Sequence, residues 1–186
     1  MVHYHYIIAI KRIINFIISG VPVAWMLSSN GTTETIAFFV HWVRNRSPEV
    51  SPRVIMTDCD LAQIAALKIV YSESHIYLCK WHVLRAMRSH LDIIKHAELW
   101  EKVKKLVNIR DETEFDELWA EISNNPSSPK TFIKYMAQKW IPLPQREKWS
   151  LVYCKNQSIF EEGDTNMLIK AYVIVFNLLI TSKLIF

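Results

Sequence analysis

The chain has 186 residues, of which 51% are hydrophobic, 22% are charged and 12% are aromatic. This composition excludes an intrinsically disordered or low-complexity protein, and the length is sufficient for a substantial hydrophobic core. Only three glycines occur, which disfavours Gly-rich phosphate loops, and the net charge of +4 permits a polyanionic partner without requiring one.

Cysteine usage and hydropathy bear on the compartment. Cys59, Cys79 and Cys154 are an odd, irregularly spaced set, which favours a reducing compartment over a disulfide scaffold. The apolar runs 6–18 and 171–186 carry polar interruptions and fall short of the roughly 18 uninterrupted apolar residues of a membrane span. We therefore expect an intracellular protein with no membrane partner, in which these runs form buried strand or helix.

The first elements predicted are strands over residues 3–10 and 21–27, where β-branched and aromatic residues are frequent. A helix follows, capped by Thr32 or Thr33 and ended before Pro48. Its inward face is predicted to consist of Ile36, Val40 and Val43.

Two further strand–helix pairs follow. Residues 54–56 predict a strand, and Asp60 predicts the cap of a helix that runs to about Tyr71 and is apolar almost all round, hence buried. Residues 76–79 predict another strand, followed by a helix over 80–94. The apolar stripe of that helix comprises Leu84, Met87, Leu91 and Ile94. This order predicts βα units and a largely parallel sheet.

From residue 97 onward the pattern predicts helices only. The first covers residues 98–108, and Asp111 with Glu114 forms a capping box for the second. The Ser128-Pro129 pair opens a third helix, which Pro142 ends. An α/β part is therefore expected to precede a helical part.

Asp58 is the first candidate for chemistry. It follows an apolar strand, so its carboxylate is expected at the strand's carboxyl end, where parallel sheets bind ligands. Carboxylates gathered there can hold Mg²⁺ or Mn²⁺, and two such ions can activate a hydroxyl for attack on a phosphodiester. The alternative is that Asp58, like Asp60, caps the following helix.

The second candidate is the pair Cys79-x-x-His82. Zinc would need two further ligands, and no second tight pair of cysteines or histidines lies nearby, so a zinc site is not expected. Cysteine–histidine catalysis is disfavoured, because Cys154 lacks a flanking Gly-rich turn and Cys79 is near His82 in sequence only. His82, Arg85 and Arg88 could instead face a DNA phosphate, although a solvated basic face explains these arginines equally well.

Two stretches resemble the central block of MULE-type transposase domains. The first runs from Arg53-Val54-Ile55-Met56-Thr57-Asp58 to Ala65-Ala66, and the second is Leu78-Cys79-Lys80-Trp81-His82-Val83-Leu84-Arg85-Ala86. The segment Gly20-Val21-Pro22-Val23-Ala24-Trp25 resembles the strand that precedes them in the family. The resemblance covers residues 20–90 well and residues 130–175 loosely.

The resemblance implies an α/β fold with an RNase H-like core, whose mixed or parallel sheet carries helices, followed by an all-α insertion. It implies cut-and-paste transposition by three acids and two divalent ions, Mg²⁺ or Mn²⁺, with Asp58 as the second acid. DNA at transposon ends is the implied partner, Cys79 and His82 fill the family's C-x-x-H signature, and Cys79, His82, Arg85 and Arg88 are the candidate DNA-binding residues. The expected segments are a partial core over 1–96, a helical insertion over 97–160, and a remnant of the last core helix with an aberrant apolar tail over 161–186.

Two departures from the family pattern predict a catalytically inactive protein, incomplete at both ends. No acidic residue precedes Glu34, so the first acid is expected upstream of the sequence. The third acid belongs in a motif that here is Asp164-Thr165-Asn166-Met167-Leu168-Ile169-Lys170, where Lys170 occupies the acid's position. An ammonium in place of a carboxylate repels the cation that such a site binds.

The expected protein is therefore a transposase derivative without strand transfer, located in the nucleus by resemblance. Two alternatives remain: a domesticated DNA-binding or regulatory module without catalysis, and a translated relic prone to aggregation. The sequence leaves a homo-oligomer open.

Overall fold

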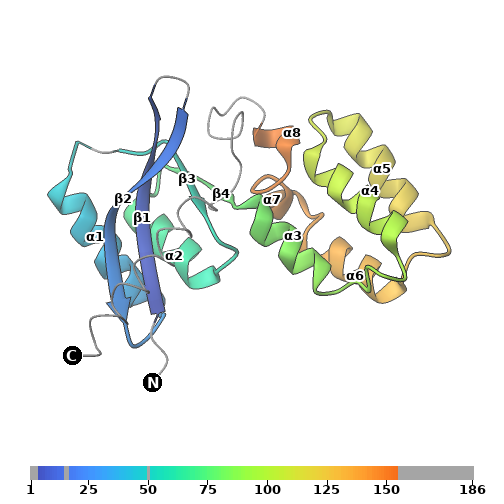
Figure 1. Cartoon of the computed structure of the whole chain (residues 1–186), viewed down its shortest axis with the longest axis horizontal. Helices are drawn as coiled ribbons and strands as arrows, with labels where there is room; N and C mark the ends of the chain where they lie inside the picture. Colours follow the sequence, from blue (N-terminus) through green and yellow to red (C-terminus); the bar gives the residue numbers. More distant parts are fainter. Residues whose placement is uncertain (1–3, 15–16, 50, 155–186) are drawn as a thin grey trace. The chain divides into compact units, whose positions relative to one another are not determined.

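The computed structural model describes residues 4–14, 17–49 and 51–154 (Figure 1). Their contacts divide them into two compact units. The first consists of the described residues up to 75 without 56–59, and the second consists of 56–59 and the described residues from 76 onward. The three predicted segments (1–96, 97–160 and 161–186) stay a prediction, and most of the last one lies outside the described residues.

The first unit contains a long antiparallel pair. Strand β1 (Tyr4–Ile14) pairs with β2 (Ile17–Ser28), with Lys11 opposite Gly20 and a shift in register between Ile8 and Ala9. The prediction of a largely parallel sheet is therefore wrong for this pair. Two residues separate the strands, whereas a parallel connection needs a crossover of a dozen or more residues.

Helices α1 (Thr33–Arg46) and α2 (Leu61–Val70) pack together in this unit. Thr32 caps α1 and Asp60 caps α2, as predicted. The shared core consists of Ile36, Ala37, Phe39, Val40, Ala66 and Val70, with Val43 partly buried against it. The prediction that α2 is buried all round is wrong, because Leu61 is 82% and Ile69 60% exposed.

Strands β3 (Val54–Thr57) and β4 (His75–Leu78) form a second two-stranded sheet. The His75 N–H donates to the Arg53 carbonyl at 2.9 Å and the Cys79 N–H to the Thr57 carbonyl at 2.8 Å. Both bonds join residues 22 positions apart, so the strands are parallel and end together. The predicted βα order is confirmed here, because α2 connects the two strands.

Helix α3 (Lys80–Arg88) is shorter than predicted. Val83, Met87 and the later Leu91 are buried, but Ile94 is 90% exposed. The Asp92 side chain accepts hydrogen bonds from the Ile94 and Lys95 N–H groups at 3.2 and 3.3 Å. Such local bonds give the backbone an alternative to the helix, so the stripe predicted to reach Ile94 is cut short.

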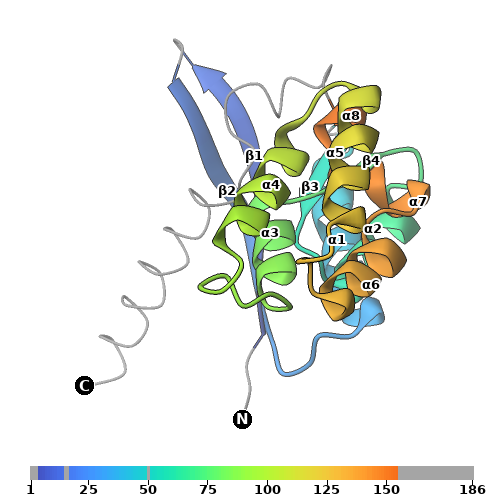
Figure 2. The same cartoon turned by 90° about the vertical axis from the view of Figure 1, so that its right-hand side faces the viewer.

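Only helices follow α3 in the described part of the chain, as predicted. Helices α4 (Ala97–Asn108) and α5 (Glu112–Asn124) lie side by side (Figure 2). Asp111 caps α5 through the Glu114 N–H at 3.0 Å. The later helices are α6 (Lys130–Lys139), α7 (Leu143–Arg146) and α8 (Leu151–Cys154).

The architecture is thus mixed α/β, with a helical region after the second sheet. The described strands form two separate two-stranded sheets, so the continuous sheet of an RNase H-like core is not observed among them. Among the described helices, none combines the length and the hydropathy needed to cross a membrane.

Candidate functional site

Asp58 lies at the carboxyl edge of the second sheet, as the sequence predicts. It directly follows β3, and the hydrogen bond between Cys79 and Thr57 holds the end of β4 beside it. Helix α3 starts one residue after Cys79, which occupies the N-cap position. The parallel register therefore brings Asp58 next to the first turn of α3.

His82, on that first turn, contacts Asp58. Its Nδ1 lies 2.9 Å from the Asp58 Oδ1, and the two side chains are 14% and 35% exposed. An ionised carboxylate offers only acceptor atoms, so it attracts an N–H of the ring or the positive charge of the protonated ring. The sequence singled out both residues but not their contact, which joins positions 24 apart.

The two cysteines near this edge are poorly placed for chemistry. Cys79 is 1% exposed, so its thiol packs in the interior and cannot itself reach DNA. Burial raises the pKa of Cys59 to about 11, with Asp58 and Cys79 adding to the rise and Lys139 opposing it. A thiol with that pKa stays protonated at neutral pH, which makes it a weak nucleophile and a weak metal ligand.

The second unit's α3 carries a basic outer face. Arg85 and Arg88 are exposed, and the nine residues of α3 include no acidic side chain. Trp81 is 36% exposed, and the Arg85 guanidinium lies 5.1 Å from the centre of its ring. The edge-to-face contact of Trp81 with His82, at 4.7 Å between ring centres, joins this face to the Asp58 contact.

Trp81 was not predicted as a site residue. Its spacing of four from Arg85 is the signal that could have found it, because residues i and i+4 lie on one side of a helix. A cation over an indole ring is favoured by the ring's quadrupole, which orders both side chains.

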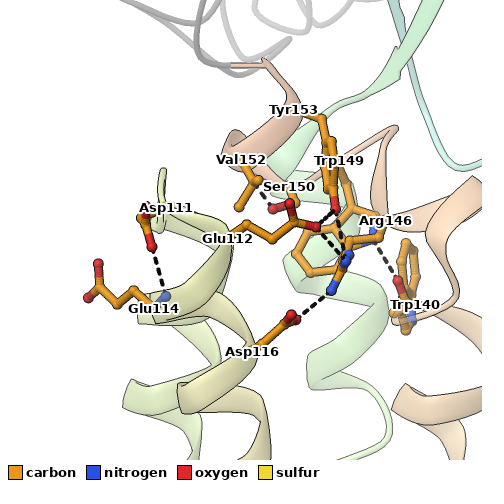
Figure 3. A network of polar contacts seen from close by, with 10 residues as sticks. All are labelled: Asp111, Glu112, Glu114, Asp116, Trp140, Arg146, Trp149, Ser150, Val152 and Tyr153. Atoms are coloured by element: carbon orange, nitrogen blue, oxygen red, sulfur yellow. Dashed lines mark hydrogen bonds and ion pairs between the residues drawn. The ribbon is translucent and has the colours of Figure 1, made fainter.

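Arg146 was also not predicted, and it joins three helices of the second unit. Its guanidinium lies 2.8 Å from an oxygen of Asp116, 3.1 Å from one of Glu112 and 2.8 Å from the hydroxyl of Tyr153 (Figure 3). It also covers the Phe115 ring at 4.9 Å. Its partners on α5 are 30 and 34 positions away, which no local pattern reveals.

The metal site predicted at Asp58 stays a prediction. Among residues 4–14, 17–49 and 51–154, no group of three or more His, Cys, Asp or Glu side chains is arranged to hold a metal ion. Lys170, at the predicted position of the third acid, lies outside the described residues.

Comparison with known proteins gives one family. The family model of the MULE transposase domain matches residues 3–86, a stretch that includes Asp58, Cys79, His82 and Arg85. The search of curated proteins gave no match. Strand β3, which ends just before Asp58, the connecting helix α2 and the start of α3 all fall inside the matched stretch. The match supports a Mutator-like (MULE) transposase domain over residues 3–86.

Proposed function

We propose that this protein is a DNA-binding derivative of a Mutator-like transposase that binds DNA through α3 and does not cut it. The observation that carries the proposal is the outer face of α3, a helix without acidic residues on which Arg85 and Arg88 are exposed. The family's transposases act on DNA, so this face has a natural polyanionic partner.

Phosphate contacts account for the expected binding. Each arginine that pairs with a phosphate releases condensed counterions, and its planar guanidinium can donate two hydrogen bonds to one phosphate. Binding of this kind does not depend on base sequence. It falls steeply as salt rises.

The lack of cleavage rests on Lys170. Two-metal chemistry needs carboxylates that bridge and position divalent ions, and an ammonium at one of these positions opposes their binding. In the described residues, the remaining acid, Asp58, is directed to His82. Mg²⁺ or Mn²⁺ is accordingly not part of the proposed activity, and zinc is not proposed either.

A location in the nucleus follows from DNA as the partner, and it belongs to the same proposal. A homo-oligomer is not required, because one copy of α3 already presents both arginines. DNA binding distinguishes the two alternatives, because a domesticated regulatory module retains it and a translated relic does not.

Salt-dependent binding of a duplex oligonucleotide tests the proposal. We expect log affinity to fall linearly with log salt, and the variant Arg85→Ala/Arg88→Ala to lower the slope by about 2, since each arginine contributes about 1. The control Arg53→Ala/Arg110→Ala removes the same charge from two exposed arginines outside α3. Binding that ignores salt, or an equal loss in the control, would contradict the proposal.

A further inference from the structure

Trp81 adds an exposed aromatic ring to the α3 face, and phosphate binding does not require such a ring. The residue is 36% exposed, although tryptophan is a costly side chain to leave in water. Arg85 lies over the ring at 5.1 Å, and His82 meets the ring at an interplanar angle of 87°. The ring is thus held in place by two neighbours while more than a third of the residue remains accessible.

We infer that Trp81 is a stacking platform for an unpaired DNA base, held beside Asp58. The inference rests on the proposed DNA binding and adds the kind of DNA that is preferred. The juxtaposition that carries it is an exposed indole between an arginine and the histidine that contacts the acid.

The geometry of DNA makes this platform selective. Bases within a duplex offer only their edges to a protein, because their faces are covered by neighbouring base pairs. An indole on a protein surface can stack on a base only where that base has left the helix, as in a bulge, a frayed end or a single strand. Arg85 and Arg88 supply the positive charge that attracts the adjoining phosphates.

A second tryptophan–arginine pair provides a matched control. On α1, Arg46 lies 4.3 Å from the centre of the Trp42 ring, with the same spacing of four residues, and Trp42 is 44% exposed. That pair belongs to the first unit and has no acid–histidine contact beside it among the described residues. We therefore expect Trp42→Ala to leave the preference for an unpaired base intact.

The test compares two duplexes of equal length, one fully paired and one carrying a single bulged adenine. At constant salt we expect the wild-type protein to bind the bulged duplex about tenfold more tightly, as stacking on one aromatic ring allows. Trp81→Ala should bring the ratio of the two affinities close to one. Trp81→Phe should retain part of it, and Trp42→Ala all of it.

A second readout needs no variant. With 2-aminopurine at the bulge, stacking on Trp81 should quench its fluorescence when the wild-type protein binds. Equal, salt-dependent affinities for the two duplexes without quenching would overturn the inference and leave the proposed DNA binding in place. Failure to bind either duplex would overturn both.

Discussion

At the scale of single residues, Arg146 shows how one side chain can organise a helical region. Its side chain is 12% exposed, whereas Glu112 and Asp116 are 56% and 59% exposed. The cation thus lies mostly inside, with its charge balanced by carboxylates at the surface. Charge-assisted bonds with this planar geometry exceed the strength of ordinary surface ion pairs.

We predict that Arg146→Met destabilises the protein. Loss of bonds to two carboxylates and a hydroxyl should lower the free energy of unfolding by about 1–3 kcal/mol, and Arg146→Lys should recover only part because an ammonium cannot bridge the same partners. Urea unfolding followed by circular dichroism measures this. A loss no larger than that of Arg110→Met, a change at an exposed arginine, would show that the contacts contribute little.

At the scale of elements, two neighbouring aspartates have separate roles. Asp60 accepts hydrogen bonds from the Ala62 and Gln63 N–H groups at 2.8 and 3.2 Å, which makes it the cap of α2. Asp58 instead meets His82 at the start of α3. The sequence alone allows either aspartate to cap α2.

We predict that Asp60→Ala lowers the free energy of unfolding by about 1 kcal/mol, while Asp60→Asn has a smaller effect because asparagine also caps helices. Neither change should alter the affinity for DNA, since Asp60 lies outside α3. Denaturation and binding measured on the same preparations check both statements. Weaker binding by Asp60→Asn, without a loss of stability, would assign Asp60 to the binding site instead.

The elements that could be predicted from the sequence are those with local signals. Thr32, Asp60 and Asp111 each cap a helix through bonds to residues two or three positions ahead, so their starts are visible in the sequence. The end of α3 was missed because Asp92 satisfies backbone groups that the apolar stripe had assigned to the helix.

In the candidate site, too, only the features with local signals could be predicted from the sequence. Asp58 could be placed at a strand end because the apolar run before it is short and local. The contact of Asp58 with His82 could not be predicted, because this contact depends on the register of β3 against β4. The three partners of Arg146 lie on two other helices, and only the packed structure brings them together.

At the scale of the whole molecule, the chain combines a match to a known domain with the proposed loss of its catalysis. The MULE domain match covers residues 3–86, and the helical stretch from α4 onward follows it. In the proposed function, the basic face of α3 still binds DNA, but the protein no longer cleaves it. DNA binding and the absence of cleavage can be measured separately, and one experiment measures both.

That experiment incubates the protein with supercoiled plasmid and Mg²⁺ or Mn²⁺, and measures the bound and the nicked fractions together. Our prediction is that plasmid is bound, that binding weakens as salt rises, and that no open-circular product forms above the protein-free control. Nicking that requires the metal, disappears in Asp58→Ala and persists in Asp60→Asn would contradict it.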